Sequence, residues 1–298
     1  MSYHNPVLLQ ESVDALSIKQ DGVYVDVTFG GGGHSREILS RLGENGRLFG
    51  FDQDPDAQGN IIDDERFVLI PENFRYISRF LRFHGVRKVD GVLADLGVSS
   101  HQFDEAERGF STRFDGDLDM RMNQKSKVSA KEIINNYSEE KLAEILFLYG
   151  ELRNSRNIAK TIVEKRADEK IDTSFQLREA LQRYLPKAKE HKIIAQIFQA
   201  IRIEVNEELE VLKEFLKQMP NLLTEEGRLS VISYHSLEDR LVKRFIRNGL
   251  FEGEPERDMF GNFDVPLKKV GKLIIPSNEE IKINNRARSA KLRIAEKL

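Results

Sequence analysis

The sequence predicts an α/β protein with a Rossmann-like, doubly wound parallel sheet that an inserted helical domain interrupts. Three observations lead to this fold class. Short apolar runs alternate with helical segments over residues 7–95, which is typical of a parallel sheet. After Asp95 the strand pattern stops, and helical periodicity continues to about Met219. Strand-like apolar runs then return, so we expect the sheet to resume after the insertion.

The elements before the insertion follow from their apolar patterns. They are a helix at 7–16, a strand at 24–29, a helix at 36–42, strands at 47–51 and 66–70, a helix at 74–83 and a strand at 89–95. The polar residues near the ends of these strands are Asp26, Asp52, Asn73 and Asp95. Because the carboxyl ends of parallel strands meet at one edge of a sheet, we expect these side chains to converge there.

The insertion and the returning sheet have equally distinct patterns. Apolar residues over 194–216 follow the i, i+3, i+4, i+7 spacing of a long amphipathic helix, which we expect to lead back into the sheet. A strand at 227–233, a helix at 237–245, a mobile loop at 249–266 and closing strands at 272–275 and 290–295 follow. We therefore predict a first core segment at 1–105, a helical insertion at 106–205 and a second core segment with a basic tail at 206–298.

Four consecutive glycines, Gly30–Gly33, follow the first strand. Glycines at this place allow left-handed backbone angles and let a ligand lie against bare main chain, beside the unpaired N–H groups of the next helix. Asp52, about twenty residues further on, can accept hydrogen bonds from ribose hydroxyls. A dinucleotide fingerprint would need Gly or Ala at Ser35, and a Walker A motif would need Lys followed by Ser or Thr. A nucleoside without a pyrophosphate, such as S-adenosylmethionine, suits the loop better; an ordinary tight turn is the alternative.

Composition restricts the class of protein. The 298 residues are 40% hydrophobic and 32% charged, which is typical of a folded domain in water. The absence of cysteine excludes disulfides, thiolate metal sites and a cysteine nucleophile. The sequence shows neither a signal peptide nor an apolar run of transmembrane length, so we expect a cytoplasmic protein without a membrane partner.

The charge distribution is uneven. The formal net charge is −3, yet residues 268–298 contain nine lysines and arginines against three glutamates, a net charge of +6 that leaves −9 elsewhere. Such a tail suits a polyanionic partner, although a solvated surface would have the same composition.

Other motifs indicate neither a metal site nor a hydrolase. The run Asp115–Asp119 resembles the start of an EF-hand loop, but the required Gly and Glu are replaced by Met120 and Ser126. No two histidines have zinc-ligand spacing on one helix face, so we expect no metal. The segment Ser233–Ser236 lacks a G-x-S-x-G elbow, which leaves His235 as a candidate for substrate contact or as a structural histidine.

Specific motifs occur along nearly the whole chain. They are His4–Leu9, Asp26–Ser35, Phe51–Pro55, Asp95–Ser100, Glu105–Ser111, Gly116–Met122, Phe198–Arg202, Ser233–Arg240 and Arg286–Glu296. Together they resemble the bacterial MraW/RsmH family of methyltransferases, which modify N4 of a cytosine in 16S ribosomal RNA of the small subunit. The resemblance implies S-adenosyl-L-methionine as methyl donor and a methyltransferase core with a helical insertion. The donor-site residues that it implies are Gly32, Gly33, His34, Asp52, Phe74, Asp95 and Gln102.

The expected substrate contacts lie elsewhere in the motifs. Tyr234 and His235 are the predicted catalytic residues, because a target base that leaves its stack needs a flat or hydrogen-bonding partner. We expect Ser99 and Ser100 to line the base pocket. RNA phosphates are expected to contact Arg108, Arg113, Arg286, Arg288, Lys291 and Arg293.

The expected partner is small-subunit ribosomal RNA within the assembled 30S subunit. The insertion would recognise RNA shape or, as an alternative, form a homodimer interface. Rival functions are methyl transfer to DNA or protein, a non-catalytic RNA-binding assembly factor and a nicotinamide oxidoreductase, the last disfavoured by Ser35.

Overall fold

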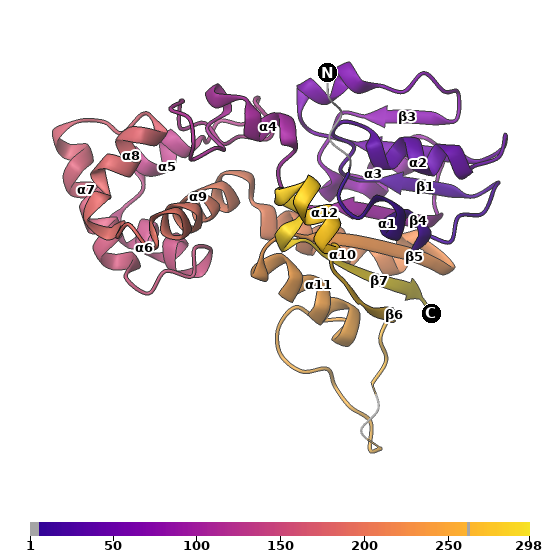
Figure 1. The fold of residues 1–298 in the computed structure, drawn as a ribbon. Coiled ribbons are helices and arrows are strands. Elements are labelled where there is room, and N and C mark those ends of the chain that lie inside the picture. The colour runs from indigo at the N-terminus through magenta and orange to yellow at the C-terminus, as the bar shows by residue number, and fades with distance from the viewer. Residues whose placement is uncertain (1–5, 261–262) are drawn as a thin grey trace. The chain divides into compact units, whose positions relative to one another are not determined.

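The computed structural model describes residues 6–260 and 263–298, so His4 and Asn5 of the first motif lie outside the described residues. The chain divides into two compact units. Unit 1 is Met1–Gly97 with Leu209–Leu298, and unit 2 is Val98–Glu208. Figure 1 shows the elements of both units in chain order, and each unit is described by itself.

Unit 1 is built on a seven-stranded sheet in the order β3-β2-β1-β4-β5-β7-β6. Its strands are β1 (Val23–Asp26), β2 (Arg47–Phe51), β3 (Phe67–Ile70), β4 (Val89–Asp95), β5 (Leu223–Ser233), β6 (Leu267–Ile274) and β7 (Lys291–Lys297). The first five strands pair in parallel, whereas β7 pairs antiparallel with both β5 and β6. This arrangement confirms the predicted doubly wound α/β core, with an antiparallel addition at one edge.

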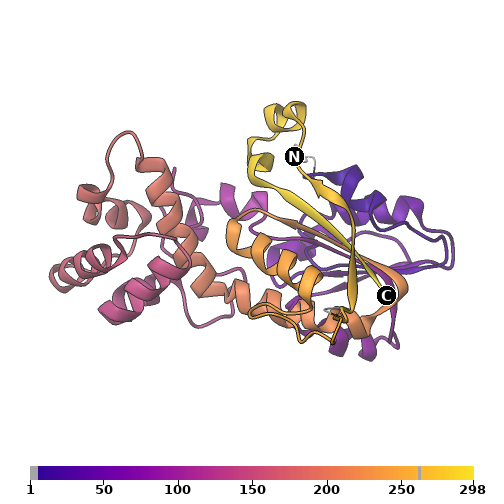
Figure 2. The same cartoon turned by 90° about the horizontal axis from the view of Figure 1, so that it is seen from below.

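Helices cover both faces of the sheet, as Figure 2 shows. The helices and short 3-10 turns of unit 1 are α1 (Leu9–Asp14), α2 (Gly33–Arg41), η1 (Pro55–Asn60), η2 (Phe74–Tyr76), α3 (Ile77–Phe83), α10 (Glu208–Leu222), α11 (Ser236–Asn248), α12 (Asn278–Ile283) and η5 (Asn285–Ser289). Apolar residues of α1 and α2 form one core with Tyr24 and Leu48. Those of α3, α10 and α11 form a second core with Val25 and Val92. Because the central strands are buried from both sides, they have nearly continuous apolar sequences.

Unit 2 is helical and has a core of its own. Its elements are α4 (Ser100–Asp104), η3 (Ala106–Arg108), α5 (Ala130–Asn136), α6 (Glu139–Leu148), α7 (Ser155–Asp168), α8 (Ser174–Ala180), η4 (Gln182–Tyr184) and α9 (Glu190–Asn206). Ser129, Ser138 and Thr173 accept hydrogen bonds from backbone N–H groups three residues on and so define the starts of α5, α6 and α8. The apolar stripe of α9 packs into this core, as predicted from its spacing.

The unit boundaries differ from the predicted segment boundaries. The first boundary lies after Gly97 and not after residue 105, because Val98 and Phe103 pack against the core of unit 2. The second lies after Glu208 and not after residue 205. The packing of residues 98–104 could not be predicted from the sequence, because this stretch has no regular apolar periodicity.

The expected long helix over 194–216 is wrong as a single helix. It divides into α9 and α10 at Glu207, whose φ of 50° is left-handed.

Two further differences concern the closing strands. β6 begins at Leu267 and not at residue 272, and α12 and η5 lie between β6 and β7. Among the described helices, none combines the length and the apolar character that crossing a membrane requires.

Candidate functional site

The glycine loop combines a fixed shape with an open main chain. Gly30 and Gly32 have φ values of 50° and 75°, and Gly32 precedes α2 as its N-cap. A Cβ at Gly32 would lie 2.9 Å from Phe29, and one at Gly33 would lie 2.2 Å from Pro6. Gly31 is exposed, and a Cβ there would meet nothing within 4 Å. Packing therefore requires glycine at positions 32 and 33, while the backbone at Gly31 is accessible to a ligand.

Asp52 joins the end of β2 to this loop. Its Oδ2 accepts a hydrogen bond from the Gly30 N–H at 2.8 Å, and its Oδ1 accepts one from the Asp54 N–H at 2.8 Å. Burial raises the pKa of Asp52 to about 6, against the lowering effect of these two hydrogen bonds. Each carboxylate oxygen has a second lone pair, so the side chain can still accept hydrogen bonds from a ligand.

Asp26, at the end of β1, forms hydrogen bonds with the start of the glycine loop and with α2. It is fully buried and accepts hydrogen bonds from the Ser35 hydroxyl at 2.7 Å and the Thr28 N–H at 3.1 Å. Burial raises its pKa, and the neighbouring His34 acts in the opposite direction. Ser35, the residue that departs from a dinucleotide fingerprint, thus ties α2 to the end of β1.

Asp95 lies at the end of β4 between Tyr234 and His34. The Tyr234 hydroxyl donates to Oδ1 of Asp95 at 2.7 Å, and Nδ1 of His34 lies 4.0 Å from Oδ2. The Asp95 N–H donates to the Thr28 hydroxyl oxygen at 2.7 Å, which connects the ends of β4 and β1. Burial raises the pKa of Asp95 to about 6, although 22% of its side chain is exposed; His34 and the Tyr234 hydrogen bond act against that rise.

Tyr234 is a hydrogen-bond donor in this arrangement. Burial and the adjacent Asp95 carboxylate raise the pKa of Tyr234 well above its ordinary value, so the phenol remains protonated. Its ring lies beside Gly97, where a Cβ would come within 3.4 Å of it, and Gly97 has a left-handed φ of 103°. The turn after β4 therefore leaves space for the tyrosine ring that follows β5.

His34 is oriented by the chain before α1. Its Nε2 lies 3.2 Å from the Val7 carbonyl oxygen, which can only accept, so Nε2 carries a proton. The ring is buried, with 5% exposed. His34 therefore directs Nδ1 toward Asp95, at 4.0 Å from Oδ2, and the two form an ion pair only when the ring carries both protons.

His235 caps α11. Its Nδ1 accepts the Glu238 N–H at 3.4 Å, its Nε2 lies 3.2 Å from Oε1 of Glu238, and only 8% of the side chain is exposed. The Glu238 carboxylate in turn accepts hydrogen bonds from the N–H groups of Tyr234 and His235 at 2.9 and 3.3 Å. This capping box favours the structural alternative for His235.

Phe74 packs against the core of unit 1. Its ring makes an edge contact with Phe215 at a centroid distance of 5.3 Å, and the side chain is half-buried. Asn73, also expected at the ligand edge, caps η2 and donates to the Gln53 side chain at 2.9 Å. Core packing thus accounts for part of the Phe74 side chain, and its contact with adenine stays a prediction.

The site residues predicted on unit 2 lie around α4 and the loop after it. Ser99 and Gln102 form a capping box, in which Ser99 Oγ accepts the Gln102 N–H and Gln102 Oε1 accepts the Ser99 N–H. Ser100 is the first residue of α4. Arg113 is exposed, whereas Arg108 is buried and donates to the Arg121 carbonyl at 3.0 Å. Arg108 therefore holds its own loop, and the RNA contact expected of it stays a prediction.

The basic tail is partly neutralised. Lys291 and Arg293 of β7 pair with Asp239 of α11 at 3.3 and 2.7 Å. Arg286 and Arg288, on η5, are exposed. From the sequence, all four residues were expected to contact RNA. The antiparallel pairing of β7 with β5 brings two of them, Lys291 and Arg293, to Asp239.

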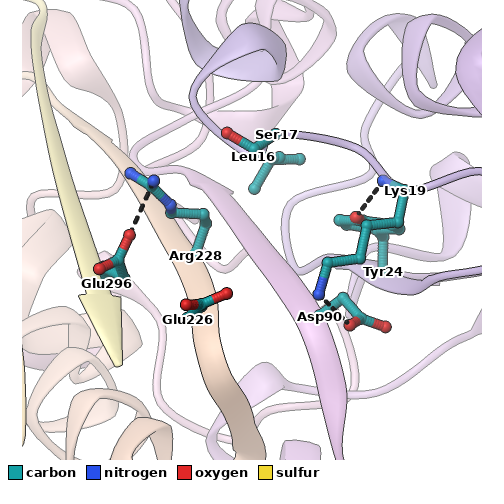
Figure 3. A pocket seen from close by; sticks show the side chains of 8 residues that line it. All are labelled: Leu16, Ser17, Lys19, Tyr24, Asp90, Glu226, Arg228 and Glu296. Carbon is teal, nitrogen blue, oxygen red and sulfur yellow. Dashed lines mark hydrogen bonds and ion pairs between the residues drawn. The ribbon is translucent and has the colours of Figure 1, made fainter. Parts of the chain in front are cut away.

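A pocket of about 270 Å³ lies at the other end of the strands, as Figure 3 shows. It is lined by Leu16, Ser17, Lys19, Tyr24, Asp90, Glu226, Arg228 and Glu296. Lys19 pairs with Asp90 at 3.4 Å, and Arg228 pairs with Glu296 at 2.7 Å. The pocket is near the amino ends of β1 and β4 and contains no predicted site residue. Its two basic residues thus pair with two of its three acids, and the carboxyl edge remains the candidate site.

Comparison with known proteins agrees with the motifs. The sequence model of the MraW methylase family matches residues 1–298. The chain belongs to the MraW methylase family. This confirms the resemblance expected from the motifs.

Relatives of this MraW-family chain are similar over their whole length. Ribosomal RNA small subunit methyltransferase H of Flavobacterium johnsoniae is 66% identical over 298 residues, which cover 100% of this chain and 99% of the relative. The protein of the same name from Christiangramia forsetii is 67% identical with the same coverage. That from Bacteroides fragilis is 56% identical and covers 99% of this chain and 98% of the relative. A solved rRNA methylase from Streptococcus thermophilus has a TM-score of 0.44 at 12% identity, covering 100% of this chain and 99% of that one.

Several residues of this MraW-family site were absent from the prediction. Thr28 accepts the Asp95 N–H, Ser35 donates to the buried Asp26 carboxylate, and Glu238 holds the backbone of Tyr234. The spacing of Glu238, three residues after the cap at His235, is a sequence signal that could have identified it. The roles of Thr28 and Ser35 had no such signal, because they depend on side chains that meet only in the folded sheet.

Proposed function

We propose that this chain transfers a methyl group from S-adenosyl-L-methionine to the N4 amino group of a specific cytosine in 16S ribosomal RNA. Membership of the MraW methylase family supports methyl transfer, and the names of its relatives support small-subunit ribosomal RNA as substrate. The observation that carries the proposal is the acidic edge of unit 1, where Asp52 lies against the glycine loop and Asp95 meets Tyr234.

The residues at this edge fit the proposed donor. Gly31 offers exposed backbone, and Asp52 keeps lone pairs for ribose hydroxyls. The raised pKa values of Asp52 and Asp95 mark carboxylates that a nearby positive charge would stabilise. A cationic ligand therefore suits the edge better than the pyrophosphate of a dinucleotide.

Each donor-site residue has a separate task in this proposal. S-adenosylmethionine supplies an activated methyl group on a positively charged sulfonium. Asp52 binds the ribose, Asp95 and Gln102 the amino-acid end, and Phe74 the adenine. The backbone of Gly32 and Gly33 and the His34 side chain complete the donor site.

Tyr234, with its neighbour His235, is the residue that we assign to the target base. The N4 lone pair of cytosine is delocalised into the ring, so an acceptor must hold the amine hydrogens and direct that lone pair at the methyl group. A half-buried tyrosine ring can stack on a base that has left its helix. Tyr234 cannot act as a base because its pKa lies well above the ordinary value. Most of the rate would thus come from positioning and electrostatics.

The remaining parts of the proposal concern the substrate. Ser99 and Ser100 line the base pocket, and Arg113, Arg286 and Arg288 contact RNA phosphates. The substrate is the RNA within the 30S subunit, in the cytoplasm. The helical unit recognises RNA shape, with a homodimer interface as its alternative role.

Mass spectrometry of 16S ribosomal RNA tests the proposal. Small subunits and naked RNA that lack the modification, and separately DNA, are incubated with the protein and S-adenosylmethionine. The RNA, the DNA and the subunit proteins are each analysed, and Asp52→Asn serves as the inactive control. We expect a single N4-methylcytosine with the wild-type protein. Methylation of DNA or protein only, or no methylation despite donor binding, would contradict the proposed substrate; the second result would favour an assembly factor.

A further inference from the structure

The exposed face of α11 carries a stripe of positive charge. Its members occupy positions i, i+3, i+4 and i+7, and they are Arg240, Lys243, Arg244 and Arg247. The opposite face of the helix packs into the core of unit 1 through Val242, Phe245 and Ile246. Because residues at this spacing share one side of a helix, the four cations follow a line along the surface. Lys243 and Arg247 are both exposed.

Acidic side chains on α11 do not balance this charge. Glu238 is buried and accepts the N–H groups of Tyr234 and His235. Asp239 pairs with Lys291 and Arg293 of β7. No acidic residue follows on the helix up to Asn248. Arg244 donates to the Gly253 carbonyl, a neutral acceptor that leaves its positive charge in place.

The stripe starts beside the candidate site. α11 begins at Ser236, directly after Tyr234 and its capping neighbour His235, and Tyr234 is bonded to Asp95. The first basic residue, Arg240, lies about one helical turn further on, and the stripe continues for roughly 10 Å to Arg247. An RNA strand whose base reaches Tyr234 would therefore have lysine and arginine side chains beside its neighbouring phosphates.

We infer that the exposed face of α11 binds the phosphates of the RNA strand that carries the target base. The inference rests on the proposed function and adds a location for strand binding. It also gives less weight to Lys291 and Arg293, which share the single negative charge of Asp239. Phosphates paired with lysine and arginine give an affinity that falls steeply with salt.

The test compares two double variants that lose the same charge. Lys243→Ala with Arg247→Ala removes two cations of the stripe. Lys19→Ala with Arg87→Ala removes two from the segments before β1 and β4, at the opposite end of the parallel strands. The affinity for naked 16S ribosomal RNA is measured as a function of salt concentration, together with S-adenosylmethionine affinity, methylation of small subunits and thermal unfolding.

We expect the α11 variant to reduce the slope of log affinity against log salt by about 1.4, at about 0.7 per lost phosphate contact with a single strand. The control variant should keep the wild-type slope, and both should keep the wild-type donor affinity and unfolding temperature. An unchanged slope in an α11 variant, or an equal loss in the control, overturns the inference even if the wild-type protein methylates 16S RNA. Slower methylation of small subunits with unchanged binding to naked RNA also overturns it, in favour of a protein contact. A wild-type protein that neither binds nor methylates the RNA overturns the proposed function itself.

Discussion

The phenol oxygen of Tyr234 lies 2.7 Å from Oδ1 of Asp95, so a side-chain hydrogen bond joins the ends of β5 and β4 across 139 residues of sequence. Unit 2 is inserted between these two strands. The bond therefore adds to the backbone pairing of β4 with β5, which connects the part of the sheet before the insertion to the part after it. It also places an aromatic ring and a carboxylate at the edge where the donor and the base are proposed to meet.

Replacing Tyr234 with Phe removes this hydrogen bond and keeps the ring. Since the bond lowers the pKa of Asp95 against the effect of burial, its loss should raise that pKa further, by roughly one unit for a bond to a charged group. The acidic limb of the pH profile of kcat should shift to higher pH, while RNA affinity stays near wild type. The profile is measured from pH 5 to 9. Tyr234→Ala should lose RNA affinity as well, and a Phe variant with the wild-type profile would contradict the role of the bond.

Asp52→Asn should weaken binding of S-adenosylmethionine by about tenfold or more, because it removes the charge of an acceptor near a ribose and a bound cation. Isothermal titration measures the affinity. Asp56→Asn, at an exposed acid four residues further along the chain, is the matched control and should bind as wild type does. Equal affinities for all three proteins would show that Asp52 does not contact the donor.

The acidic edge should make stability depend on pH. The pKa values of Asp52 and Asp95 are raised from 3.8 to about 6 in the folded chain, so between these limits the folded state binds more protons than the unfolded state. The free energy of unfolding should therefore fall as pH rises from about 4 to about 6 through these two groups. Urea unfolding at pH 5 and pH 7 measures the difference. Asp95→Asn should show a smaller difference than wild type, and an identical pH dependence would argue against a raised pKa.

Ser35→Ala should destabilise unit 1 by about 2 kcal/mol, because a fully buried Asp26 loses a hydrogen-bond donor. Ser40→Ala is the control on the same helix, since the Ser40 hydroxyl is exposed and donates to the Glu37 carbonyl. Its effect should stay within about 0.5 kcal/mol. Chemical denaturation measures both free energies. Similar losses in the two variants would mean that the Asp26 contact contributes little.

The helices and strands of unit 1 were predictable because each has its own apolar pattern within a short stretch of sequence. The apolar runs that became β1 to β4 are buried on both faces, so nearly every residue in them is apolar. The glycine loop and Asp52 follow their strands at a spacing that the parallel fold determines. The helical character of unit 2 appeared in the same way, through its apolar period. The family motifs supplied Phe74 and Gln102, which no periodicity would have selected.

Only the tertiary structure decided which of these side chains act on one another. The bond between Tyr234 and Asp95 and the ion pairs of Lys291 and Arg293 with Asp239 depend on strand order. The link between Ser35 and Asp26 depends on the shape of the glycine loop between β1 and α2. The break at Glu207 likewise interrupts an apolar period that continues through it. A sequence pattern indicates which face of a helix or strand is apolar, but it does not indicate which neighbouring element packs against that face. Pairing between distant strands is selected by the free energy of the whole sheet, and the charges that meet at its edge follow from that selection.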